Sequence, residues 1–139
     1  MATEVGTGSD APAARPEGKV HGFVRALRPR QWAKNVLVFA APVAAGSIDE
    51  WSVARDSIFA FVAFCLAASG TYLLNDARDV ESDRLHPVKR NRPIASGVVS
   101  LPLAYGAGAV LIVAALAIGF ATARNLGITL LAYLVLTTT

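Results

Sequence analysis

The sequence predicts an all-α polytopic membrane protein, and three observations support this fold class. Apolar residues make up 54% of the 139 residues and charged residues only 17%, whereas soluble domains usually carry about a quarter charged residues. The mean hydropathy is +0.48. After residue 35, most charges fall into two short stretches, 49–56 and 76–92, which leaves long uncharged runs around them.

The N-terminal segment differs from the remainder. Residues 1–22 are small, polar and rich in Gly, Pro and Ala, so we expect a disordered tail. No apolar run follows a charged start there, as a signal peptide would require. Residues 23–139 are expected to form the transmembrane helices.

Four apolar segments predict about four transmembrane helices, at about 36–48, 58–74, 101–123 and from 126 to the end. The first is short for a bilayer, which needs about 20 residues, so it must recruit the residues just before it. The last is still apolar where the sequence stops, and we therefore expect the N-terminal part of a larger membrane protein, truncated at the C-terminus. Glycines inside the runs, including Gly70, Gly106 and Gly108, predict close helix packing.

The distribution of positive charge predicts the orientation. Six Lys and Arg residues precede the first run, one lies in the first connection, five in the second and one in the third. Because cytoplasmic loops carry the excess of Lys and Arg, the N-terminus and the second connection are expected in the cytoplasm, in a plasma-membrane protein. This topology explains the basic pI better than a nucleic-acid partner does.

The sequence NDARDVESD, residues 75–83, follows the second run directly. If the helix continues through it, 100° per residue places Asp76, Asp79 and Asp83 within an arc of about 60°, with Asn75 at its border. Aligned carboxylates repel one another unless a cation lies between them, and oxygen ligands suit Mg²⁺. We therefore predict a metal and catalytic site at these aspartates; a solvated loop that merely ends a helix is the alternative.

Basic residues near the motif are candidates for binding a phosphorylated substrate. Lys89, Arg90 and Arg92 follow in the segment HPVKRNRPIASG, and Lys34 lies in the block RPRQWAKN before the first run. Charge-assisted bonds from Lys and Arg suit phosphate oxygens. The alternatives are that the loop residues only fix topology and that the block around Lys34 only anchors the chain at the membrane surface. We expect His86 to be a loop residue.

The motif N-D-x-x-D-x-x-x-D, followed by KRNRPIASG, resembles the first aspartate motif of the UbiA-type membrane prenyltransferase superfamily. The resemblance implies the first part of a bundle of about nine transmembrane helices, in which two Asp-rich cytoplasmic loops hold Mg²⁺ and a diphosphate. The blocks RPRQWAKNVLVFAAPVAAG and YLLNDARDVESDRLHPVKRNRPIASG further resemble a phosphoribosyl-transferring branch of that superfamily.

This finer resemblance implies transfer of a 5-phosphoribosyl group from 5-phosphoribosyl 1-diphosphate to decaprenyl phosphate, a polyprenyl phosphate lipid, for cell-wall arabinan synthesis. Asp76, Asp79 and Asp83 would hold the diphosphate through Mg²⁺, with Asn75 assisting, and Lys89, Arg90, Arg92 and Lys34 would neutralise phosphate charge. A homo-oligomer is compatible with the sequence. The alternatives are an aromatic prenyltransferase, which would use the same aspartates, and a fragment of a membrane cation transporter.

Overall fold

The computed structural model describes residues 18–138, and every regular element in that range is helical. In chain order the elements are α1 (Lys19–Leu27), η2 (Pro29–Phe39), α2 (Ala40–Ala44), α3 (Trp51–Arg78), α4 (Val80–Leu85), η3 (Lys89–Asn91), α5 (Leu101–Thr122) and α6 (Arg124–Thr138). The all-α prediction is confirmed for the described residues. Helix α1 begins inside the tail predicted to be disordered, so that boundary was wrong; residues 1–17 of the tail lie outside the described range.

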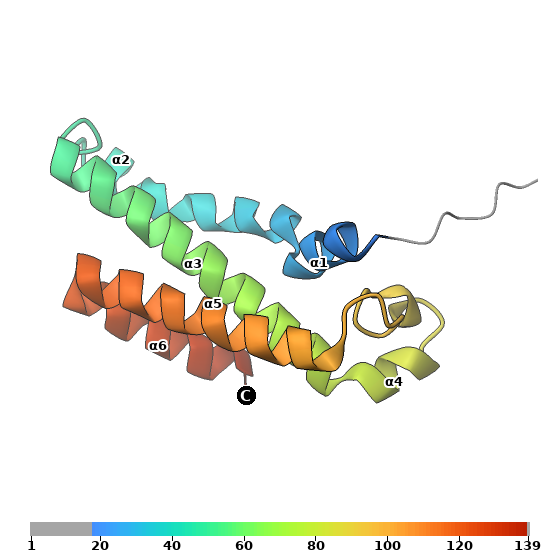
Figure 1. Ribbon diagram of the computed structural model, residues 1–139. Helices are drawn as coiled ribbons and strands as arrows, with labels where there is room; N and C mark the ends of the chain where they lie inside the picture. The colour runs from blue at the N-terminus through green and yellow to red at the C-terminus, as the bar shows by residue number, and fades with distance from the viewer. Residues whose placement is uncertain (1–17, 139) are drawn as a thin grey trace, which may run out of the picture.

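Helix α3 is the centre of the arrangement and contacts each of the other α-helices and η2. Figure 1 shows α5 and α6 running along one side of α3, while η2 and α2 follow its other side. Two hydrogen bonds join η2 to α3: Trp32 Nε1 donates to Ser69 Oγ at 2.8 Å, and Asn35 Nδ2 donates to Cys65 Sγ at 3.5 Å.

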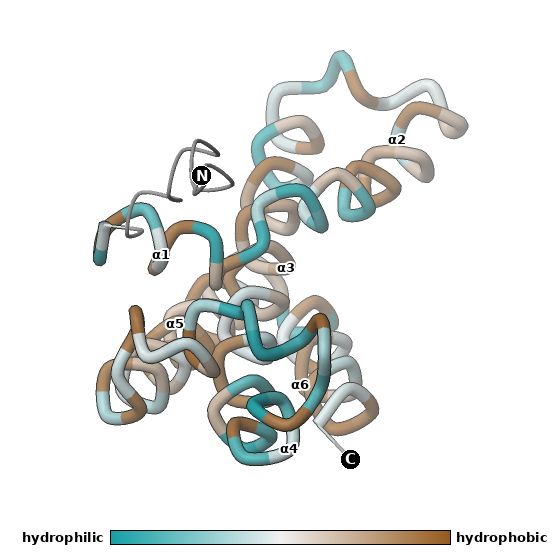
Figure 2. The backbone as a smooth tube through the Cα atoms, turned by 90° about the vertical axis from the view of Figure 1, so that its right-hand side faces the viewer, coloured by the Kyte–Doolittle hydropathy of each residue, from teal (hydrophilic) through white to brown (hydrophobic). Residues whose placement is uncertain are grey.

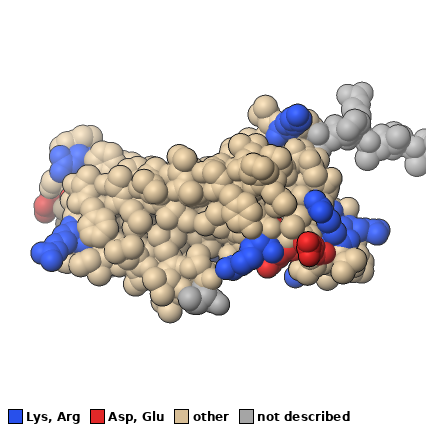
Figure 3. Space-filling model, turned by 60° about the horizontal axis from the view of Figure 1, so that its bottom comes forward, with Lys and Arg blue, Asp and Glu red and all other residues tan. Residues whose placement is uncertain are grey.

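Charged side chains gather near the two ends of the long axis, with an uncharged band between them (Figure 3). Within residues 18–138, two helices, α3 and α5, are long and apolar enough to cross a membrane. On α5, Val110 and Val113 are each 66% exposed, so this helix presents apolar side chains outward.

The first predicted span is not one long helix. It comprises the end of η2, the short α2 and a turn at Gly46, whose φ of 71° is left-handed. The fourth apolar segment lies in α6. Four membrane crossings therefore remain a prediction.

Close packing between α3 and α5 is confirmed for Gly70 and Gly108. A Cβ atom at Gly70 would lie 2.8 Å from the carbonyl oxygen of Gly108, and one at Gly108 would lie 3.1 Å from that of Gly70. A Cβ at Gly106 would meet nothing within 4 Å, so this glycine plays no part in the contact.

A small hydrophobic core lies at the end of the molecule that carries the aspartate motif. It joins α1, α3, α4, α5 and the segment between α4 and α5. Its residues are Ala26, Leu73, Ala77, Val80, Ile94, Val99 and Ala104. This core holds the charged segments around the motif against the end of α3.

Candidate active site

The aspartate motif lies at a break between two helices. Helix α3 ends at Arg78, Asp79 has φ −91° and ψ 10°, and α4 starts at Val80. The assumption of one continuous helix was therefore wrong, and Asp79 does not share a buried face with the other two aspartates. The break lets Val80, 6% exposed, pack into the core beside Ile94 and Val99, while Asp79 is exposed to solvent.

Asp76 is buried and bound by two arginines. Its side chain is 5% exposed, and both carboxylate oxygens accept hydrogen bonds of 2.9 Å from Arg28 Nη2. Arg92 Nη1 donates to Oδ1 of the same carboxylate at 3.3 Å. A buried carboxylate without such partners would be strongly unfavourable, so the arginines stabilise Asp76 in its charged form.

Arg92 also joins Asp76 to Asp83. The Nη1 atom that contacts Asp76 donates to Asp83 Oδ2 at 3.1 Å, and the Asp83 side chain is only 4% exposed. The structure thus brings together two of the three predicted aspartates and one predicted substrate-binding residue. The three side chains form what we call the Asp76–Asp83 pair and its bridging arginine.

The pair is suited to hold a cation, because one guanidinium nitrogen already lies between the two carboxylates. Two acidic groups around one positive charge are also what a divalent metal requires. Within the described residues, no three His, Cys, Asp or Glu side chains form a group that could hold a metal ion. Asp76 and Asp83 are the carboxylates that could hold such an ion, and in this structure Arg92 Nη1 lies between them.

Arg28 was missed as a site residue by the sequence analysis, which counted it only as a topological charge. Its backbone is left-handed, with φ 54° and ψ 60°, a conformation that residues other than glycine rarely adopt. The Arg28 guanidinium lies 4.4 Å from the centre of the Tyr72 ring. Next to it, Ser69 Oγ donates to the carbonyl oxygen of Leu27 at 2.7 Å, which fixes the end of α1 on α3.

No local sequence signal could have identified the contact between Arg28 and Asp76, because the two residues are 48 positions apart. The residue before a proline usually adopts an extended conformation. Arg28 precedes Pro29 and departs from that preference, so the pattern of the sequence did not indicate its geometry.

The segment between α4 and α5 is fixed over the pair by backbone contacts. Arg25 Nη2 donates to the carbonyl oxygen of Asn91 at 2.9 Å, and Arg84 Nε donates to that of Ala95 at 3.0 Å. The Nδ1 atom of His86 accepts hydrogen bonds from the backbone N–H groups of Val88 and Lys89, both at 3.1 Å. His86 is therefore a loop-stabilising residue, as expected.

The other predicted substrate-binding residues lie outside this network. Lys89 and Arg90 are exposed, in η3, and Lys34 is exposed on η2. Asn75 Oδ1 accepts a hydrogen bond of 2.8 Å from Arg78. Figure 2, which views this end of the molecule, shows a hydrophilic stretch in the segment between α4 and α5, with hydrophobic residues on either side of it.

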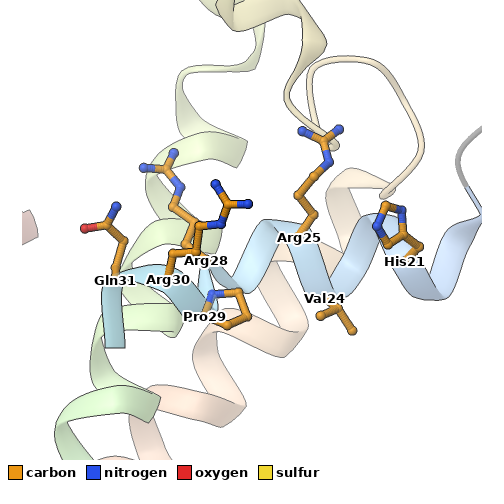
Figure 4. A pocket seen from close by; sticks show the side chains of 7 residues that line it. All are labelled: His21, Val24, Arg25, Arg28, Pro29, Arg30 and Gln31. Atoms are coloured by element: carbon orange, nitrogen blue, oxygen red, sulfur yellow. The ribbon is translucent and has the colours of Figure 1, made fainter. Parts of the chain in front are cut away.

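A pocket of about 550 Å³ lies beside the pair, at the junction of α1 and η2. Arg25, Arg28 and Arg30 line it and extend to the same side of the chain in Figure 4, with Gln31 at one end. None of the described residues that line it is acidic. We call it the arginine pocket.

A comparison with protein families identifies the fold. Residues 36–139 match the sequence profile of the UbiA prenyltransferase family. The chain belongs to this family. Enzymes of the UbiA family generally use a divalent metal ion, and the family together with the two long apolar helices indicates an integral membrane protein.

Three curated UbiA-type relatives carry the name decaprenyl-phosphate phosphoribosyltransferase. The protein of Mycolicibacterium smegmatis is 50% identical over 137 residues, covering 96% of this chain and 43% of its own length. The protein of Corynebacterium glutamicum is 51% identical over 107 residues, covering 76% of this chain and 32% of its own length. The protein of Mycobacterium tuberculosis is 50% identical over 129 residues, covering 90% of this chain and 43% of its own length. The chain thus spans less than half the length of the relatives it matches.

Proposed function

We propose that the protein carrying this chain transfers the 5-phosphoribosyl group of 5-phosphoribosyl 1-diphosphate to decaprenyl phosphate and releases diphosphate. The observation that carries the proposal is the 50% identity to the decaprenyl-phosphate phosphoribosyltransferase of Mycolicibacterium smegmatis over 96% of the chain. The buried Asp76–Asp83 pair among arginines supports it, because a diphosphate group needs several cations in a restricted space.

In this reaction the bond between C1 of the ribose and the diphosphate oxygen breaks, and the electron pair leaves with the diphosphate. A phosphate oxygen of the lipid forms the new bond to C1. Because that phosphate is already an anion, no strong general base is required. The ring nitrogen Nδ1 of His86 is not offered as one, because it accepts two backbone hydrogen bonds.

Asp76 and Asp83 would hold a divalent metal, proposed to be Mg²⁺, with Asp79 and Asn75 contributing from the exposed side of the helix break. The bound ion would stabilise the negative charge of the departing diphosphate. Arg28 would keep the Asp76 carboxylate in a fixed orientation. Arg92 would neutralise the pair until the ion arrives, and then would be free to contact phosphate together with Lys89, Arg90 and Lys34.

The proposal includes a location. The aspartate motif and the N-terminus would lie on the cytoplasmic side of the plasma membrane, where a water-soluble sugar phosphate is accessible. The product would serve as a precursor for cell-wall arabinan.

The experiment is to incubate the complete protein, in lipid vesicles with Mg²⁺, with labelled 5-phosphoribosyl 1-diphosphate and decaprenyl phosphate. We expect release of diphosphate together with a labelled phosphoribosyl lipid. An aromatic prenyltransferase would give no such product and would instead transfer a prenyl group from a prenyl diphosphate to an aromatic acceptor. That second result would overturn the proposal.

A further inference from the structure

We propose that the arginine pocket is a separate binding site for a phosphate monoester, held mainly by Arg30 and Arg28. This inference rests on the proposed function, because both of its substrates carry such a group. The donor has a phosphate on C5 in addition to the diphosphate on C1, and the acceptor has a phosphate at the end of its lipid chain. Prenyl diphosphates carry no phosphate monoester.

The charge balance of the pocket favours an anionic ligand. Arg28 is neutralised by Asp76, and Arg25 donates to the carbonyl oxygen of Asn91. Arg30 is exposed and forms no hydrogen bond or ion pair with the residues that the structure describes. Among the described residues, the pocket therefore offers a guanidinium group that no carboxylate neutralises, and guanidinium groups bind phosphate through two parallel hydrogen bonds.

The backbone at Arg28 sets the direction of the pocket's side chains. The left-handed conformation ends α1 and starts η2 in a new direction, and it is held by hydrogen bonds from the Arg28 N–H group to Arg25 O at 3.1 Å and from the Gln31 N–H group to Arg28 O at 2.9 Å. Such a conformation costs about 1 kcal/mol or more in a residue other than glycine. Its result is that the three arginines reach the same side of the chain (Figure 4).

One polar atom of a residue that lines the pocket is unsatisfied within the described part of the chain. Gln31 Oε1 is buried and has no hydrogen-bond partner among the described residues, although buried polar atoms are nearly always paired. Gln31 lines the pocket. A hydroxyl group of a bound ligand, such as that of a sugar or of a protonated phosphate, would satisfy it.

The pocket is adjacent to the Asp76–Asp83 pair. Arg28 belongs to both, because its Nη2 atom binds Asp76 and the residue lines the pocket. A ligand in the pocket therefore lies next to the proposed diphosphate site. Val24 and Pro29 add an apolar wall, which is compatible with the lipid acceptor as well as with the ribose of the donor.

The test compares Arg30→Gln with Arg124→Gln, both in the complete protein. Arg124 is also exposed but lies at the start of α6, far along the chain from the pocket. Binding is measured by calorimetry without turnover, once with ribose 5-phosphate and once with decaprenyl phosphate in nanodiscs. Unchanged thermal unfolding of both variants checks that the proteins remain folded.

We expect Arg30→Gln to weaken binding of one of the two ligands by about tenfold or more, as loss of a charge-assisted contact should, and Arg124→Gln to have no effect. The ligand that loses affinity identifies the source of the phosphate. If Arg30→Gln binds both ligands as the wild type does, or if the wild type binds neither, the pocket is not a phosphate site. The proposed function is judged separately, by formation of the phosphoribosyl lipid in the wild type.

Discussion

At the residue scale, the site is built on two buried carboxylates whose charge is balanced by arginines from distant parts of the chain. Arg28 binds Asp76 through both carboxylate oxygens and lies over Tyr72, whereas Arg92 uses one nitrogen to reach both acids. Arg28 therefore serves one acid, and Arg92 joins two. In the proposed mechanism, the metal ion would take the place of Arg92 between the two carboxylates.

The different environments of the aspartates predict different effects on stability. Asp76→Asn should lower the free energy of unfolding by roughly 1.5–3 kcal/mol, because it weakens charge-assisted hydrogen bonds to a partly buried guanidinium. Asp79→Asn, at an exposed position, should change it by no more than about 0.5 kcal/mol. Thermal unfolding of the purified variants in detergent measures both changes in stability. Equal Tm values for Asp76→Asn and the wild type would contradict the ion pair between Asp76 and Arg28. Both variants should lose nearly all activity.

The exposed cations of the loop predict an effect on one substrate. Lys89→Ala and Arg90→Ala should raise the KM for 5-phosphoribosyl 1-diphosphate by roughly ten- to a hundredfold each, which corresponds to a lost contact of about 1.5–3 kcal/mol. The KM for decaprenyl phosphate should change much less. Steady-state kinetics of the complete protein measure this difference, and unchanged KM values for both substrates would leave these residues with a role in topology alone.

The sequence indicated several residues that the structure brings together, but not the contacts among them. The spacing of the motif and the nearby cations pointed to Asp76, Asp83 and Arg92, which the structure brings together. The placement of Asp79 was wrong because the helix breaks where Val80 turns into the core, and a 100° periodicity cannot anticipate a tertiary contact of that kind. Arg28 was missed because its partner lies 48 positions away.

At the element scale, the packing of α3 on α5 depends on glycines that let the two backbones approach. The contact between Gly70 and Gly108 lies within the pair of helices that are long enough to cross a membrane. Small residues at such contacts are typical of membrane helices, where close van der Waals packing drives association. The sequence predicted this packing, while the register that selects Gly70 and Gly108 and leaves Gly106 out required the structure.

Gly70→Ala tests that contact. The added Cβ would lie 2.8 Å from a backbone oxygen that cannot move aside easily, so we expect destabilisation of about 1–3 kcal/mol. Gly106→Ala is the matched control in α5, because nothing lies within 4 Å of its Cβ position, and it should leave stability unchanged or slightly raised. The Tm of each variant in detergent measures the difference, and an equal Tm for both would mean that the helices pack in another register.

At the scale of the whole molecule, the face seen in Figure 3 carries its charged side chains near the two ends of the long axis, with an uncharged band between them. The aspartate motif and the arginine pocket share the end of the molecule where α3 ends, and the turn before α3 lies at the other end. The sequence predicted this polarity from the positions of Lys and Arg. It did not predict that η2 and α2 together replace one long first helix.

The orientation of this axis can be measured with single cysteines in a Cys65→Ala background. A cysteine at Ser82, which is exposed in α4, should react with an impermeant maleimide only after the cytoplasmic face is opened. One at Ser47, in the turn before α3, should react in intact cells. Both should react in detergent, which controls for accessibility. Labelling of the Ser82 variant in intact cells would place the site outside the cytoplasm.

The central claim is that the Asp76–Asp83 pair holds the divalent metal of a diphosphate donor, and Mn²⁺ binding followed by electron paramagnetic resonance tests it most directly. The complete protein is titrated with Mn²⁺ in the presence of 5-phosphoribosyl 1-diphosphate, as wild type, as Asp83→Asn and as Asp56→Asn, an acid of α3 that lies near the opposite end of that helix. We predict that Asp83→Asn lowers the protein-bound Mn²⁺ signal at least about tenfold, since one charged ligand is lost, and that Asp56→Asn matches the wild type. Equal Mn²⁺ binding by Asp83→Asn and the wild type would contradict the account.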